Sequence, residues 1–132
     1  MSDDTEIDVV ASMRLPARAE SARQARRFIA EFCKAATLGE DICETAALLV
    51  SELVSNAILH GRTAATVEVH RPLDTLRVSV RDDNPHLPAV GVRPALDLES
   101  GRGLTIVSML ASRWGVERDG DGKSIWFELA TS

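Results

Sequence analysis

Apolar residues along this chain recur with two different spacings, and each spacing predicts a different kind of element. Steps of three and four residues predict one helix over residues 17–36 and a second from Glu40 to about Leu59. Gly61 follows the second helix and is a natural C-terminal stop. The apolar stripe of that second helix consists of Ile42, Ala46, Leu49, Leu53 and Ala57.

Alternation of apolar and polar residues predicts the strands. The alternating segments are residues 9–15, 66–70, 76–81, 114–118 and 124–129. Turn-forming residues at 72–75 and at 119–122 join two pairs of these segments. We therefore expect two antiparallel hairpins and a first strand that pairs elsewhere.

A third helix is expected after a long irregular loop. The loop spans residues 82–100 and contains three prolines, and loops of this length in small domains are usually functional or mobile. Gly101-Arg102-Gly103 opens the helix, whose expected buried side is formed by Leu104, Val107, Leu110, Ala111 and Trp114. The order of elements predicts an α+β fold, a two-layer sandwich with helices on one face of a mixed or antiparallel sheet.

Length and composition limit the classes of function. The 132 residues suffice for one domain, expected over residues 9–132 after a short disordered N-terminus at residues 1–8. A net charge of −5 argues against direct nucleic-acid binding. We find no signal pattern, and no apolar run approaches membrane-spanning length, so we expect a cytoplasmic protein without membrane contact. Cys33 and Cys43 lack metal-ligand spacing and suit a reduced compartment.

Glu52, Asn56 and His60 recur every four residues at the end of the second predicted helix. A step of four residues turns an α-helix by only about 40°, so these side chains would form one polar ridge. An amide oxygen suits a magnesium ion, and a carboxylate can accept a proton from a hydroxyl. Taken alone, the ridge is equally consistent with ordinary hydrogen bonds at a helix end.

Two further segments carry residue types that suit a nucleotide. Asp82 lies where an apolar strand gives way to a turn, and a buried carboxylate there can accept the exocyclic amine of a purine. Alone, this segment is more simply interpreted as turn chemistry. Gly101 and Gly103 precede a helix, where backbone amides and the helix dipole attract an anion. A single Gly-x-Gly is weak evidence and matches neither a P-loop nor a dinucleotide fingerprint.

The order and spacing of these segments resemble the GHKL, or Bergerat-fold, ATPases. Within that superfamily the chain looks most like the small anti-sigma-factor serine/threonine kinases. The resemblance extends from about Ala17 onward and includes Gly122-Lys123-Ser124 as the last motif. It implies a Bergerat ATP-binding fold, with ATP and Mg²⁺ as cofactors.

The resemblance also implies a role for each matched residue. Glu52 would be the catalytic base, Asn56 would hold Mg²⁺ and Asp82 would bind the adenine. Residues 83–100 would form the ATP lid, and the hydroxyl of Ser124 would approach the adenine. The implied ATP-binding residues are Asn56, His60, Asp82, Asn84, Arg93, Gly101, Arg102, Gly103, Leu104 and Ser124.

The activity implied by the resemblance is transfer of the γ-phosphate of ATP to a Ser or Thr of an anti-sigma-factor antagonist. A sigma factor would be the second partner, and binding of one would exclude the other. A homodimer is also expected, because the exposed apolar strand at residues 9–15 could pair across a dimer axis.

Other classes of function stay open. The presence of Glu52 favours a kinase. Asn84 stands where the family usually has glycine, which favours a module that binds partners without transferring phosphate, with or without ATP. A plain α+β domain whose motif matches arise by chance is the third and weakest interpretation.

Overall fold

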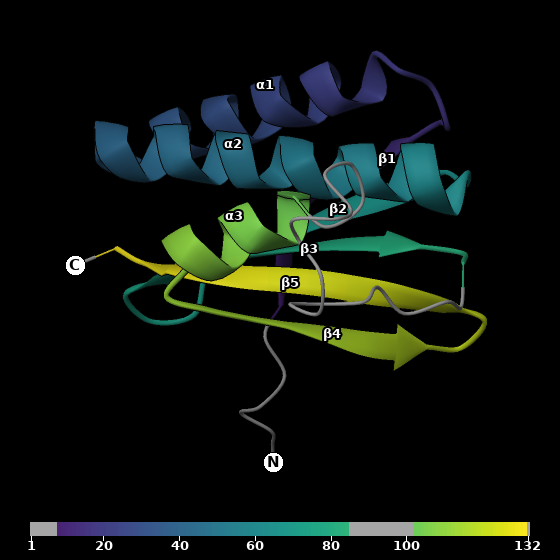
Figure 1. Cartoon of the computed structure of the whole chain (residues 1–132). Coiled ribbons are helices and arrows are strands. Elements are labelled where there is room, and N and C mark those ends of the chain that lie inside the picture. Colours follow the sequence, from purple (N-terminus) through teal and green to yellow (C-terminus); the bar gives the residue numbers. More distant parts are fainter. Residues whose placement is uncertain (1–7, 85–101, 132) are drawn as a thin grey trace.

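Five strands form one antiparallel sheet in residues 8–84 and 102–131, which are the residues that the computed structural model describes (Figure 1). Their order across the sheet is β1-β2-β3-β5-β4. The strands are β1 (Val9–Leu15), β2 (Ala65–His70), β3 (Thr75–Asp82), β4 (Arg113–Asp119) and β5 (Gly122–Ala130). Every neighbouring pair is antiparallel, so the predicted α+β sandwich is confirmed and its sheet is antiparallel rather than mixed.

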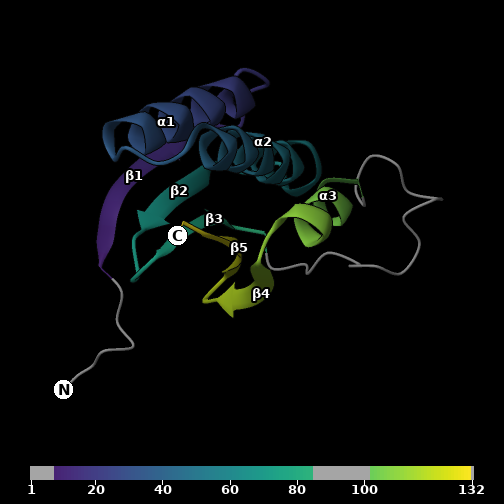
Figure 2. The ribbon, with the colours of Figure 1, turned by 90° about the vertical axis from the view of Figure 1, so that its left-hand side faces the viewer.

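The helices lie on one face of this sheet (Figure 2). They are α1 (Ser21–Ala35), α2 (Glu40–Asn56), the π-helical turn η1 (Ala57–Gly61) and α3 (Arg102–Leu110). Helix α2 contacts both α1 and α3, as well as strands β3 and β5. It is therefore the element around which the helical layer is assembled.

The core lies between the two layers and follows the predicted alternation. Every second residue of the central strands is buried beneath the helices, and α2 contributes its apolar stripe from the other side. The fully buried side chains include Leu49, Val50, Leu53, Val54, Val67, Val69, Leu76, Val78 and Phe127. Burial of this apolar surface is the main force that holds α2 on the sheet.

Helix α1 begins later than the expected residue 17. The backbone N–H of Arg18 donates to Pro16 O at 2.8 Å, and that of Ser21 donates to Arg18 O at 3.0 Å. The hydroxyl of buried Ser21 also donates to Pro16 O at 2.6 Å. These bonds hold the connection from β1 in a turn, and the helix starts only at Ser21.

Helix α2 does not continue as an α-helix to Leu59. It ends at Asn56 and passes into η1, and the left-handed residue after that turn is Arg62, with φ of 60°, rather than the expected Gly61. A π turn bonds each residue to the fifth before it instead of the fourth, which shifts the side chains around the axis.

Helix α3 is shorter on its C-terminal side than its apolar residues suggested. It ends at Leu110, which is 47% exposed, and Trp114 belongs to β4. The backbone N–H of Ser112 donates to Glu128 O at 2.8 Å and leads the chain into the sheet. The predicted buried side of the helix therefore holds for Leu104 and Val107 and is wrong for Leu110.

Segment Glu40–Leu59 is long and apolar enough to cross a membrane when only length and composition are considered, with a mean hydropathy of 1.5. The expectation that no run would reach this length is wrong in that sense. Its residues Leu49, Leu53 and Val54 are buried within the protein, as in the core helix of a globular domain. The predicted disordered N-terminus falls almost wholly on residues 1–7, outside the described residues.

Candidate functional site

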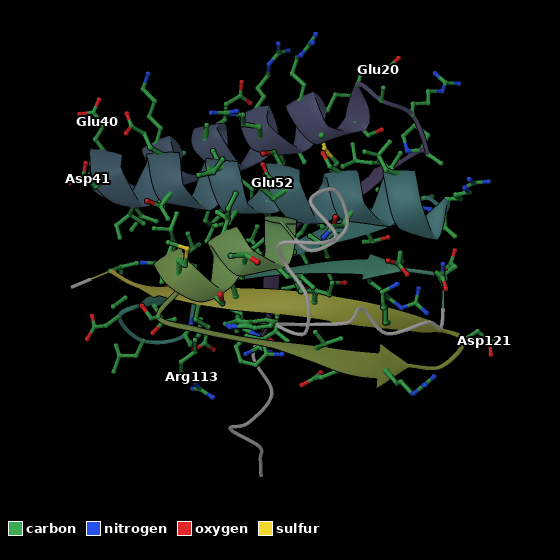
Figure 3. All side chains as sticks on the ribbon, viewed as in Figure 1. Glu20, Glu40, Asp41, Glu52, Arg113 and Asp121 are labelled. Atoms are coloured by element: carbon green, nitrogen blue, oxygen red, sulfur yellow. The ribbon has the colours of Figure 1, made fainter. Side chains whose placement is uncertain are left out.

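Glu52 and Asn56 lie one turn apart at the C-terminal end of α2, and both are half-buried. Figure 3 shows Glu52 on the part of α2 that passes α3. Helix α2 also contacts α3, the glycine-led helix that the sequence predicted. A carboxylate and an amide thus lie, partly open to solvent, on a helix that packs against α3.

His60 lies in η1, beyond the α-helical part of the segment on which Glu52 and Asn56 lie. The π turn contacts β3, and the backbone N–H of Asp83 donates to Thr63 Oγ1 at 3.2 Å. The chain after α2 is therefore attached to the end of β3. Single π turns occur frequently at functional sites, which agrees with the expected role of this segment.

Asp82 is the last residue of β3 and is buried, with 4% of its surface exposed. Directly opposite in the sheet lies Lys123, the second residue of β5. Lys123 Nζ lies 3.1 Å from Asp82 Oδ1, and the two side chains are 9% and 4% exposed. The carboxylate predicted to bind adenine is thus a member of a buried ion pair.

Asn84 completes a closed set of hydrogen bonds around this pair. Its backbone N–H donates to Asp82 Oδ1 at 2.9 Å, and its carbonyl oxygen accepts from Lys123 Nζ at 3.1 Å. Asp82, Asn84 and Lys123 therefore hold one another in place. The turn after β3 is thus fixed by the backbone of Asn84 and by the ammonium of Lys123.

Ser124 is not brought together with Asp82. It pairs with Arg81, whereas Lys123 pairs with Asp82, and neighbouring residues of a strand point to opposite faces. Lys123 shares the buried face with Ile125 and Phe127. Lys123 therefore lies beside Asp82, and sequence reasoning missed it although the alternation of β5 carried the signal. The approach of the Ser124 hydroxyl to the adenine stays a prediction.

The phosphate side of the predicted site is described only in part. Arg102 and Gly103 lie in the first turn of α3, and Leu104 is buried beneath it. Arg93, Gly101 and the rest of the predicted lid from residue 85 lie outside the described residues. Their assignment stays a prediction.

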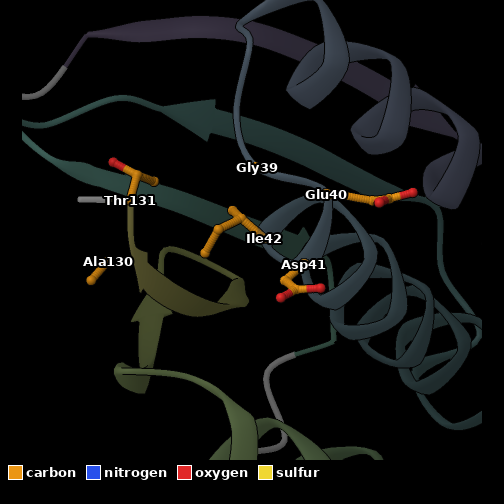
Figure 4. A pocket seen from close by; sticks show the side chains of 6 residues that line it. All are labelled: Gly39, Glu40, Asp41, Ile42, Ala130 and Thr131. Carbon is orange, nitrogen blue, oxygen red and sulfur yellow. The ribbon is translucent and has the colours of Figure 1, made fainter.

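A cavity of about 540 Å³ lies elsewhere in the described part of the chain (Figure 4). Its lining consists of Gly39, Glu40, Asp41, Ile42, Ala130 and Thr131. It adjoins the end of β5, whereas Lys123 lies at the start of that strand, and none of the predicted site residues lines it. Among residues 8–84 and 102–131, no three His, Cys, Asp or Glu side chains are grouped to hold a metal.

The chain is similar to known proteins over most of its length. Residues 15–129 match the histidine kinase-like ATPase domain. SCO4941 of Streptomyces coelicolor, an uncharacterized protein, is 41% identical over 85 residues, covering 61% of this chain and 81% of that protein.

Two solved structures have the same fold. The RsbU and RsbW domains of Rv1364c from Mycobacterium tuberculosis align with a TM-score of 0.68 and 18% identity, covering 92% of this chain and 32% of that one. The present chain thus spans about a third of that protein. The SiaB–SiaC complex from Pseudomonas aeruginosa aligns with a TM-score of 0.66 and 15% identity, covering 95% of this chain and 92% of the aligned chain of the complex. The family match spans most of the chain, which therefore belongs to the histidine kinase-like ATPase domains.

Proposed function

We propose that this ATPase-fold domain binds ATP with Mg²⁺ and transfers the γ-phosphate to a Ser or Thr of a protein partner. The observation that carries the proposal is the position of Glu52 and Asn56. They lie one turn apart at the C-terminal end of α2, a helix that contacts α3, and the η1 turn that follows them contacts β3, the strand that ends at Asp82. These positions support a site that combines an acid, an amide and a glycine-led helix.

The residues fit the cofactors that the family implies. Mg²⁺ prefers oxygen ligands and keeps several waters, so one half-buried amide oxygen at Asn56 suits it as a single protein ligand. ATP would supply the phosphoryl group that is transferred. The first turn of α3, with Arg102 and Gly103, would present backbone amides and a cation to the phosphates.

Glu52 would act as the general base. Its carboxylate is half-buried at the same helix end as Asn56, so it could accept the proton of a partner hydroxyl beside the metal site. Catalysis in phosphoryl transfer depends chiefly on positioning and charge stabilisation. A rigid helix that carries both groups is suited to that task.

The partners that we propose are an anti-sigma-factor antagonist, which would receive the phosphate, and a sigma factor, which would compete with it. The structural neighbours include the RsbW domain of Rv1364c and a complex of SiaB with SiaC, which supports protein partners in general. We also propose a cytoplasmic location.

A second function is favoured by one specific observation. Lys123 occupies the Asp82 carboxylate that would otherwise accept the adenine amine. A domain whose base-binding carboxylate is already paired could bind its protein partners without using nucleotide.

Calorimetric titration with Mg-ATP, followed by radiolabel transfer to candidate antagonists, tests the two functions. Heat of binding and label on the partner would support the kinase. Binding of Mg-ATP without label on the partner would favour the second function, a module that binds protein partners without transferring phosphate. The absence of binding to any adenine nucleotide would contradict the proposed function altogether.

A further inference from the structure

We infer that Lys123 is an internal competitor for the base of the nucleotide, so that it sets the affinity and base preference of the site. This inference rests on the proposed function, because it concerns the same site. It starts from the buried pair of Lys123 and Asp82, with 3.1 Å between Nζ and Oδ1.

The first step concerns hydrogen-bond capacity. Asp82 Oδ1 already accepts from two donors, the ammonium of Lys123 and the backbone N–H of Asn84. A lysine ammonium offers three donors and no acceptor. An exocyclic amine of adenine is also a donor, so at Oδ1 it would compete with two donors that are already in place.

The second step concerns mobility. Lys123 Nζ is held from two sides, by the Asp82 carboxylate and by Asn84 O at 3.1 Å. Its side chain is only 9% exposed, so little water is available to replace these bonds. A base that binds to Asp82 through Oδ1 must first move the ammonium out of a buried pair, which is strongly unfavourable, and a base that binds through Oδ2 must share the carboxylate with that positive charge.

The third step concerns the backbone that fixes this geometry. Gly122 packs against the backbone of Asp82, and the register pairs Lys123 with Asp82 across two neighbouring strands. Strand pairing therefore determines the position of Lys123, which does not depend on a flexible loop. The competition between Lys123 and a bound base for Asp82 therefore follows from the register of β3 and β5.

The experiment compares affinities for two ligands that share a triphosphate, Mg-ATP and Mg-tripolyphosphate, which has no base. Lys123→Thr and Lys123→Gln both remove the charge. The Gln side chain can still donate a hydrogen bond to Asp82, so this variant replaces Lys123→Thr if the Thr variant does not fold. Lys123→Arg keeps the charge. Lys34→Thr changes the chain's only other lysine, an exposed residue of α1, as a matched control. Circular dichroism verifies folding of each variant.

We expect the Thr and Gln variants to bind Mg-ATP at least about tenfold tighter than the unmutated protein, a change that calorimetry resolves readily. Binding of Mg-tripolyphosphate should not increase, and the Arg and Lys34 variants should show no gain. Binding of Mg-ATP only by the charge-removed variants would support the inference while contradicting the proposed use of ATP by the natural chain.

Two results would overturn the inference and leave ATP binding intact. One is equal or weaker binding of Mg-ATP by the Thr and Gln variants. The other is an equal gain for Mg-ATP and Mg-tripolyphosphate, which would place the effect outside the base site. If no variant binds Mg-ATP, both the inference and the proposed function are wrong.

Discussion

The backbone of Gly122 lies against the carbonyl oxygen of Asp82 so closely that a Cβ on residue 122 could not fit. Such a Cβ would also lie 3.0 Å from the carbonyl carbon of Asp82 and 3.1 Å from the Cα of Asp83. These are backbone atoms, which cannot rotate away as a side chain could. The glycine thus allows β5 to begin beside the end of β3, where Lys123 meets Asp82.

Gly122→Ala is expected to destabilise the protein because one of the two strands must move. Overpacking of this kind typically costs about 1–3 kcal/mol in the free energy of unfolding, and we expect at least that range here. Urea unfolding measures it. Gly39→Ala is the matched control, because a Cβ there meets nothing within 4 Å and φ is an ordinary −61°. Equal midpoints for both variants would contradict the prediction.

Arg77→Ala is expected to destabilise the sheet more than Arg113→Ala does. Arg77 Nη1 lies 2.9 Å from Glu128 Oε2, its Cζ lies 4.0 Å from the Trp126 ring centroid, and its side chain is 22% exposed. Arg113 Nη1 lies 3.5 Å from Glu128 Oε1, its Cζ lies 5.7 Å from the same ring centroid, and its side chain is 72% exposed. We expect a loss of about 1–2 kcal/mol for Arg77 and at most about 0.5 kcal/mol for Arg113.

Thermal and urea unfolding of the two arginine variants provide the comparison. Each substitution removes one positive charge from the same face of the sheet, so an effect of net charge on stability would be equal in the two variants. A loss for Arg113→Ala as large as that for Arg77→Ala would show that burial and distance do not decide the contribution.

The strands could be predicted from the sequence because alternation is a local property. The predicted 9–15 strand has the same bounds as β1, and the others differ from the structure by at most two residues at an end. The helix ends could not be found in the same way. Hydrogen bonds from Ser21 to Pro16 and the change to π geometry after Asn56 leave no signal in the spacing of apolar residues.

The partner of Asp82 was missed for a different reason. Which residue of β5 faces Asp82 depends on the register between two strands that are distant in sequence, and a shift of one residue would exchange Lys123 for Ser124. A lysine is also rarely buried unless it is paired. The alternation of Ile125 and Phe127 placed Lys123 on the buried face, but only the register identified its counter-ion.

Glu52→Ala is expected to abolish phosphate transfer while ATP binding persists. The change removes the proposed base but leaves Asn56, one turn further along α2, in place. Glu44→Ala is the matched control, since Glu44 lies on the same helix and is exposed. Radiolabel transfer and calorimetry are measured on both. Unchanged transfer by the Glu52 variant would remove Glu52 from the mechanism.

The thiol of Cys33 is expected to make stability depend on pH in the alkaline range. Burial raises the pKa of Cys33 from 9.0 to about 12, and the nearby Cys43 contributes to this rise. The positive charge of Arg71 acts in the opposite direction and lowers the pKa. Between these values the unfolded chain loses the proton and the folded protein keeps it. The free energy of unfolding should therefore fall as pH rises from 9 toward 12, by at most about 1.4 kcal/mol per pH unit for this one proton.

Urea unfolding at pH 8, 9 and 10 checks this dependence on pH. Other groups also titrate in this range, so the measured quantity is the difference in slope between the unmutated protein and Cys33→Ala. The variant is expected to be less stable at pH 8, because a buried side chain is truncated, and to lose less stability above pH 9. Parallel curves would contradict the raised pKa.

The edge strand β1 provides the last prediction, which concerns the homodimer that the sequence leads us to expect. β1 is at one end of the strand order, and its Val9 and Val10 are 47% and 51% exposed. An exposed apolar edge is a template for pairing with a second copy, and a lysine on such a strand opposes it. Val10→Lys is therefore expected to give a monomer by light scattering at concentrations where the unmutated protein is a dimer. Leu73→Lys, at an 89% exposed residue between β2 and β3, should leave the mass unchanged. A monomer at every concentration of the unmutated protein would rule out the dimer.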